Sequence, residues 1–389
     1  MTRQPDVLDA AEILGASQLG LVRDERAEEV PRVPVRTKLR PCCAFGSGLG
    51  VRVGSVALPG VSIGNIRSPE ELGRHRYDAG RFGQNFSAGT ERNGLIYTCR
   101  GGFIDTAHVR DYADWTLYLA TEIGRHLETG GLIEIPGAEA GMRRIRIEPV
   151  DPALIQALGR RQVTASLAVW MGFQLSIWHE IATWYGWSSF EVFSERASAF
   201  SPEDLYSNLL GAKLAGPIIT AGNDLSEDVF NAAVDAWFAR SLEFLGGLPA
   251  DLGEAAMSAV DQVWWDSEAR LPDPQLVLRR NIQNGLKIQP WLVPVERISS
   301  KASARVREAC GESAEPHTLR QPTRVPGLDY AKVLALEIEI SPDFKAVPVF
   351  DALGGQVSNS DFPLILDQIR EEVRVELGAL GDQPLFPAE

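Results

Sequence analysis

Two of the five histidines occur beside carboxylates in helical sequence patterns. In the stretch GGFIDTAHVRDYADW (101–115), Asp105, His108 and Asp111 are spaced so that about 100° per residue puts them on one helical face. A carboxylate beside an imidazole can orient the ring and raise its basicity. The spacing predicts a face that binds a metal ion or moves a proton. The alternative is an acidic helix start with a surface ion pair to Arg110.

The second histidine lies in WHEIATWYGW (178–187). His179 and Glu180 on a helix form half of the HExxH motif, in which two histidines bind zinc and the glutamate polarises water. Thr183 occupies the position of the second histidine, so the motif is incomplete by itself. We expect the helix that carries His108 to supply the missing imidazole. The alternative is a core histidine hydrogen-bonded to a carboxylate.

A third metal ligand is expected from Glu195, which follows Glu180 on the next short predicted helix, as a downstream glutamate does in glutamate-type zincins. His75 and Asp105 remain open as other third ligands. The loop around His75 also suits anion binding, through Arg74, Arg76 and Arg81.

Other polar residues are expected to have structural roles. Glu203 and Asp204 follow Ser201–Pro202, a pattern typical of the first turn of a helix. His126 and His317 have no acidic or apolar context and are expected at the surface.

The four cysteines include no CxxC pair, which argues against a zinc knuckle. We expect the adjacent Cys42 and Cys43 to be reduced and non-catalytic. Cys99 precedes a Gly-Gly turn and a predicted helix, where a cysteine can have a lowered pKa and act as a nucleophile. Its alternative role is that of a small buried hydrophobic residue.

The hydrophobic pattern predicts an α+β fold with a helical centre, peripheral β-hairpins and a small C-terminal α/β segment. Four regions are expected: an N-terminal helix and arm (1–38), a main catalytic-type domain (39–270), a Pro-rich wrapping segment (271–328) and a strand-strand-helix segment that packs on the main domain (329–389). Helices are expected at 103–127, 152–187, 190–197, 202–213, 226–246, 251–265 and 363–378. Short strands are expected within 39–66, a hairpin at 132–148, and strands at 333–341 and 346–350.

The net charge of −14 disfavours nucleic acid as a partner. The longest apolar run, Leu167–Trp178, is too short to cross a bilayer, which takes around 20 residues. No integral membrane segment is therefore expected. The first residues contain no apolar signal region, so a cytoplasmic location is expected.

Several stretches resemble a bacterial family of uncharacterised proteins, the domain-of-unknown-function 4056 family. They are LRPCCAFG (39–46), LGRHRY (72–77), NGLIYTCRGGFIDTAHVRDYADW (93–115), HEIATWYGW (179–187) and FSERASAFSPEDLYSNLLG (193–211). The resemblance implies no particular activity. It adds weight to the two polar settings, because both lie within the resembling stretches. Members of the family often look exported, a feature that this N-terminus lacks.

Together these patterns predict a metal-dependent hydrolase that acts on a small-molecule or peptide substrate. His108, His179 and Glu195 would bind zinc, with iron as the alternative; Glu180 would be the general base and Asp105 would orient a ligand. One alternative is a metal-free cysteine hydrolase or acyltransferase that uses Cys99. The other is a binding protein whose aromatic helix lines an apolar pocket with Trp170, Trp178, Trp184, Tyr185 and Trp187.

Overall fold

The computed structural model describes residues 33–36, 39–40, 42–53, 56–79, 91–188, 194–224, 226–294, 301–311 and 314–378. Most of the expected N-terminal helix and arm (1–38) lies outside the described residues. The described chain is α+β, as the sequence predicts, with a helical centre and several small sheets.

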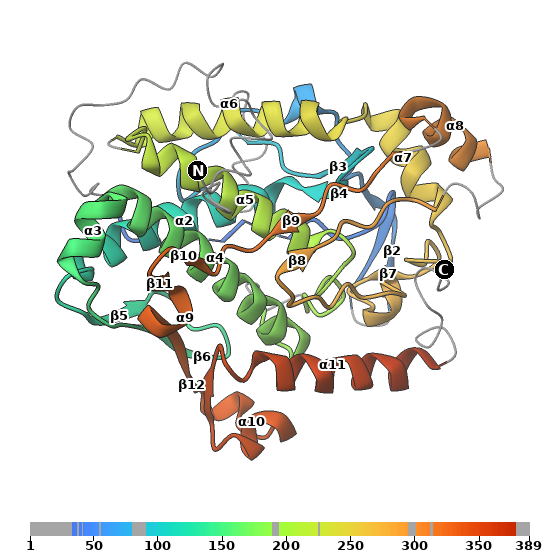
Figure 1. The fold of residues 1–389 in the computed structure, drawn as a ribbon. Helices are drawn as coiled ribbons and strands as arrows, with labels where there is room; N and C mark the ends of the chain where they lie inside the picture. The colour runs from blue at the N-terminus through green and yellow to red at the C-terminus, as the bar shows by residue number, and fades with distance from the viewer. Residues whose placement is uncertain are drawn as a thin grey trace.

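Three long helices form the centre of the fold (Figure 1). They are α2 (Thr106–His126), α4 (Arg160–Trp184) and α5 (Asp204–Thr220), and each packs against the other two. Helix α6 (Glu227–Leu245) packs on α5 and runs along the top of Figure 1. The helices carrying His108 and His179 are therefore direct neighbours, as expected.

Helix α4 is apolar on all sides because it lies in the core. From Val163 to Trp184 every residue is buried except His179, whose side chain remains 15% exposed. Across the described parts of the chain, no helix is both long and apolar enough to span a membrane.

A glycine lets α5 approach α2 closely. A Cβ atom at Gly211 would lie 2.1 Å from the carbonyl oxygen of Val109, so a larger residue would push the helices apart. Near the start of α5, the hydroxyl of Ser207 accepts a hydrogen bond of 2.9 Å from the backbone N–H of Asp105. These contacts hold the beginnings of α2 and α5 side by side.

An antiparallel sheet covers one side of the helices, with strand order β13-β12-β6-β5. It contains β5 (Gly131–Ile135), β6 (Gly141–Ile147), β12 (Leu334–Ile340) and β13 (Gln356–Ser358). Strands β5 and β6 form the expected hairpin, and their buried and exposed residues alternate. Because β12 pairs with β6 along its full length, the C-terminal region is built into the main sheet.

A second hairpin leads directly into α2. Strand β3 (Leu95–Thr98) pairs with β4 (Gly102–Asp105), and the last residue of β4 caps the helix. A third sheet contains β1 (Leu49–Val53), β2 (Val56–Ile63) and β7 (Arg270–Leu271). The strands expected within 39–66 are thereby confirmed.

Shorter elements complete the described chain. They are η1 (Pro69–Glu71), α3 (Pro152–Leu158), α7 (Ala250–Ala259), η3 (Pro274–Leu276), β8 (Lys287–Ile288), α8 (Lys301–Cys310), β9 (Leu319–Arg320), β10 (Arg324–Val325), β11 (Leu328–Asp329), α9 (Tyr330–Val333), η4 (Pro342–Phe344), α10 (Pro348–Ala352) and α11 (Phe362–Leu377).

Two expected elements are wrong. The strand expected at 346–350 is replaced by α10, because Pro348 has a backbone angle suited to the first turn of a helix. The helix expected at 190–197 is absent from its described part, since residues 194–195 are irregular and 196–197 form a turn. Helix α8, inside the Pro-rich segment, was not expected.

A disulfide joins Cys99, just after β3, to Cys310 at the end of α8. The two Cα atoms are 5.2 Å apart, within the usual range for a disulfide. Cys99 therefore has no free thiol in this structure, which removes the basis for its expected alternative role as a nucleophile. The pairing could not be seen in the sequence, because the two cysteines lie 211 positions apart.

Candidate metal centre

His108 and His179 meet between α2 and α4. Their ring centroids are 6.2 Å apart and the rings are nearly perpendicular. One ring nitrogen of each histidine and one carboxylate oxygen of Glu180 all lie within 4.8 Å of one another. Two packed helices thus bring together three of the residues that the sequence singled out.

A second group of possible ligands shares His108. The Cys42 thiol, a His108 ring nitrogen and an Asp204 carboxylate oxygen also lie within 4.8 Å of one another. His108 Nδ1 is 3.4 Å from Asp204 Oδ1. Burial, together with the charges of Asp204, Asp105 and Glu180, raises the pKa of the Cys42 thiol well above its ordinary value. Without a cation nearby, this thiol stays protonated.

Asp105 fixes the backbone around this cluster. One carboxylate oxygen accepts hydrogen bonds from the backbone N–H groups of Ala107 and His108, which caps α2. The other accepts a 2.9 Å bond from the N–H of Cys43. Asp105 therefore contacts the backbone of His108, whereas its expected role was to orient a metal ligand. Through Cys43 it also holds the neighbouring Cys42 at the cluster.

Glu180 is held by the loop that precedes α5. Its Oε2 accepts a 2.9 Å hydrogen bond from the backbone N–H of Phe200, and its Oε1 accepts a 3.5 Å bond from Asn208. Phe200 has a positive φ of 55°, which is strained for a bulky residue. A strained residue thus aims its N–H at the carboxylate.

Glu139 supports His179 from the turn between β5 and β6. The Nδ1 atom of His179 lies 3.6 Å from Glu139 Oε2, and Arg143 binds the same oxygen at 2.8 Å. Burial lowers the pKa of His179, but the pairing with Glu139 and the charges of Glu180 and Glu195 outweigh it and raise the pKa to about 9. A carboxylate behind a histidine is the usual support of a metal-binding imidazole.

Two further carboxyl groups carry raised pKa values. Burial and repulsion from Glu180, Glu203 and Asp105 raise the pKa of Asp204 well above its ordinary value. Burial and repulsion from Asp105 and Glu180 do the same for Glu203, although the Ser201 hydroxyl donates a hydrogen bond to it. The buried carboxyl groups of this cluster therefore lie close together without enough neighbouring positive charge to stabilise all of their ionised forms.

The cluster contains polar atoms that are buried and lack a hydrogen-bond partner. They include His108 Nδ1, Asp204 Oδ1 and Glu203 Oε2. Such atoms are costly to bury unless something binds them. A cation between nitrogen, oxygen and thiol donors would satisfy them and relieve the repulsion among the carboxylates, so the residues fit a metal ion.

A buried ionic network ties the segment before Cys42 to α2. The Arg40 guanidinium binds Asp111 and Asp114 at 2.8 Å each and Glu91 at 2.7 Å. Arg36 pairs with Asp111 as well. Because removing one partner of a buried ion pair costs about 3–5 kcal/mol, this network holds the cysteine segment firmly against α2.

His75 belongs to the same network. Its Nε2 lies 2.9 Å from Asp114 and its Nδ1 lies 3.3 Å from Glu91. Burial lowers the pKa of His75, but these two carboxylates outweigh it and raise the pKa. His75, left open as a third ligand, therefore serves the ionic network, and it is in neither ligand group found among the described residues.

Glu195, the expected third ligand, lies beside the cluster. Its negative charge contributes to the raised pKa of His179, but it is in neither of the two ligand groups formed by described residues.

The two remaining histidines lie away from the cluster. The Nδ1 atom of His126 is 3.0 Å from the carbonyl oxygen of Glu122, one turn earlier in the same helix. His317 packs edge-on against Phe244.

The sequence did not single out Cys42, Asp204 or Glu139 as parts of the cluster. Cys42 reaches it from an irregular segment without periodicity, and Asp204 has the sequence context of an ordinary helix start. Glu139 lies in a hairpin turn far from His179 in sequence. Cys42 and Asp204 do lie in stretches that resemble the family, LRPCCAFG and FSERASAFSPEDLYSNLLG, and this resemblance was the signal that could have pointed to them.

Most of the aromatic residues of α4 serve the core. Trp178 is fully buried against Phe350 and Phe362, and its indole N–H donates to the Glu139 carbonyl oxygen. This arrangement does not favour an apolar ligand pocket at Trp178, in the middle of that helix.

The fold and the cluster define an α+β protein with a buried histidine–carboxylate–thiol centre. The family model described as "Protein of unknown function (DUF4056)" matches residues 30–294, so the chain belongs to this family. The cluster residues from Cys42 to Asp204 all lie within the matched range. No curated protein and no solved structure matches the chain.

Proposed function

We propose that this protein is a metal-dependent hydrolase whose metal ion is bound by His108, His179 and Glu180. The observation that carries the proposal is the convergence of their ligand atoms within 4.8 Å. Two histidines and one glutamate are a common set in hydrolytic zinc sites, so zinc is the proposed ion. Iron accepts the same donors and is the alternative.

The raised pKa of Asp204 supports its assignment as a proton carrier. A buried carboxyl group whose pKa is raised is better suited than an ordinary carboxylate to donate as well as accept a proton during hydrolysis. A zinc ion held by these residues would supply Lewis acidity and would activate water for hydrolysis. Glu139 keeps the His179 ring oriented, and Asp105 keeps the backbone of His108 in position.

Glu180 has two possible roles, and one variant separates them. Its place in the ligand group supports a role as ligand, whereas the sequence pattern assigns it as general base with Glu195 as third ligand. Glu180→Gln that loses metal makes Glu180 a ligand. If the Glu180→Gln protein keeps its metal but loses activity, Glu180 is the general base.

The charge of the molecule supports the proposed substrate class. A net charge of −14 repels nucleic acids, so a small molecule or a peptide is the proposed substrate. Ester and amide hydrolysis both suit such a site.

The test combines metal analysis with hydrolysis assays on a panel of activated esters and short peptides. Asp204→Asn should retain metal and lower the rate by about 10²–10⁴-fold, as expected for a lost acid or base. Glu134→Gln, an exposed carboxylate on β5, is the matched control and should change neither. A fully active Asp204→Asn variant would remove Asp204 from the mechanism.

The Cys99–Cys310 disulfide bears on the compartment. Structural disulfides persist mainly in oxidising environments and are rare in the cytosol. The disulfide therefore favours an oxidising compartment over the cytoplasm expected from the N-terminal sequence. Thiol alkylation in intact cells before lysis tests this, because a cytoplasmic protein would be modified at both cysteines.

A further inference from the structure

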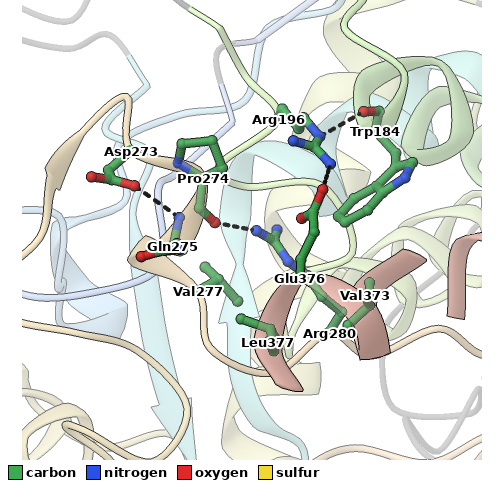
Figure 2. A pocket seen from close by; sticks show the side chains of 10 residues that line it. All are labelled: Trp184, Arg196, Asp273, Pro274, Gln275, Val277, Arg280, Val373, Glu376 and Leu377. Carbon is green, nitrogen blue, oxygen red and sulfur yellow. Dashed lines mark hydrogen bonds and ion pairs between the residues drawn. The ribbon is translucent and has the colours of Figure 1, made fainter. Parts of the chain in front are cut away.

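A pocket of about 270 Å³ lies between the end of α4, the segment at 273–280 and the last turns of α11 (Figure 2). Its lining consists of Trp184, Arg196, Asp273, Pro274, Gln275, Val277, Arg280, Val373, Glu376 and Leu377. The indole and the aliphatic side chains form apolar walls. The size suits a small ligand, since pockets for drug-sized ligands span about 300–1,000 Å³.

The acidic residues of this pocket already have partners. Asp273 lies 3.4 Å from Arg52 and accepts a hydrogen bond from the N–H of Gln275. Glu376 forms an ion pair with Arg196. Within the described ranges, Arg280 is therefore left as the pocket cation that has no carboxylate at ion-pair distance.

Three backbone carbonyl groups hold Arg280. Its Nη1 donates to Ala197 at 3.0 Å and Ala199 at 2.6 Å, and its Nη2 donates to Pro274 at 2.8 Å. A guanidinium has five N–H donors, so two of them have no acceptor among the residues that the structure describes and can bind another group. The guanidinium also lies 5.5 Å from the centre of the Trp184 ring.

The charge on Arg280 is only partly balanced. Burial lowers its pKa to about 10, while the more distant carboxylates of Asp204, Glu376 and Glu180 act in the opposite direction. Arg280 stays protonated near neutral pH; because its side chain is only partly buried, the lack of an adjacent carboxylate among the described residues costs less than it would for a fully buried cation. An anionic ligand would remove this cost.

We propose that this pocket binds a small carboxylate ligand, with the carboxylate on Arg280 and an apolar group against Trp184, Val277 and Leu377. Carboxylates match the fork of N–H donors on a guanidinium. The apolar walls select a ligand with a compact hydrophobic part.

One peptide group connects this pocket to the candidate metal centre. The carbonyl of Ala199 accepts from Arg280, and the N–H of Phe200, in the same peptide group, donates to Glu180. The lining of the pocket contains none of the proposed metal ligands, so the pocket is a neighbouring site, distinct from the centre on which the proposed hydrolase activity rests. Binding to the pocket itself does not depend on that activity.

Calorimetry on the full-length protein tests the proposal, with benzoate as the probe and benzamide as its neutral analogue. We expect saturable binding of benzoate and at least about tenfold weaker binding of benzamide, the value of a charge-assisted hydrogen bond. Equal binding of the two, or no benzoate binding, overturns the proposal. Tighter binding of inorganic phosphate than of benzoate overturns the carboxylate assignment.

Variants locate the site. Arg280→Gln should weaken benzoate binding by at least about tenfold, while Arg240→Gln, in an exposed ion pair on α6, should not change it. Leu377→Trp fills the pocket from its exposed edge and should block binding even if Arg280→Gln fails to fold. Full benzoate affinity in Leu377→Trp would place the site elsewhere. Benzoate binding to a protein that contains no metal would support the pocket while the proposed function fails.

Discussion

The pairing of Glu139 with His179 makes a quantitative prediction for the metal-free protein. The pKa of His179 is raised from 6.5 to about 9, which corresponds to roughly 3 kcal/mol in favour of the protonated ring. Glu139→Gln removes the carboxylate that contributes most to this increase. We expect the pKa of His179 to fall by about two units, because burial still lowers it while Glu180 and Glu195 still raise it.

The assay is an NMR titration of the imidazole rings after removal of metal. With five histidines in the chain, the ring signals can be resolved, and His179→Gln assigns the one of interest. Glu134→Gln on the neighbouring strand is the matched control. A His179 pKa near 6.5 in the unaltered protein, or an unchanged pKa in Glu139→Gln, would refute the assigned pairing.

Thermal stability gives the same prediction a second readout. The folded pKa of His179 lies above its unfolded value, so the associated stability is present below about pH 6.5 and is lost as the pH rises through about 9. Glu139→Gln should therefore lower the melting temperature more at about pH 6 than above pH 9. A constant difference across this range would contradict the argument.

Three further predictions concern other parts of the molecule. The raised pKa of His75 means that its stabilising contribution is present below about pH 6.5 and lost as the pH rises through the folded pKa, so His75→Gln should reduce the melting temperature mainly at acidic pH, as scanning fluorimetry can measure. Replacing Cys99 and Cys310 together by alanine should reduce the unfolding free energy in urea by about 2–5 kcal/mol, and an unchanged value would mean that the disulfide does not form. Zinc loading should tighten benzoate binding by at least about fivefold in calorimetry, because the ion neutralises the charges of Asp204 and Glu180, which partly balance Arg280. Equal affinities with and without zinc would mean that the pocket and the metal centre are not coupled.

The long helices were predictable because their residues repeat with helical periodicity over many turns. Helices α2 and α4 agree closely with the ranges 103–127 and 152–187, apart from the break at Gly159 between α3 and α4. The meeting of His108 and His179 followed from placing the two helices together. The β5–β6 hairpin was also predictable, since its residues alternate around a turn that contains glycine.

The rest of the cluster depends on contacts that a linear pattern does not encode. Cys42 is positioned by Arg40, whose three carboxylate partners come from distant segments. Asp204 begins a helix as expected, yet the close approach of α5 and α2 at Gly211 brings it to His108. Local patterns describe each residue correctly in such cases, but only tertiary packing assigns it to the site.

Metal analysis of the protein tests the central claim most directly. Elemental analysis should find about one zinc or iron ion per chain in protein purified without added metal, or after dialysis against zinc and removal of the excess. His108→Ala and His179→Ala should each lose that ion, while Glu134→Gln should keep it. A folded, unaltered protein that neither retains a metal ion nor binds zinc stoichiometrically would contradict the account.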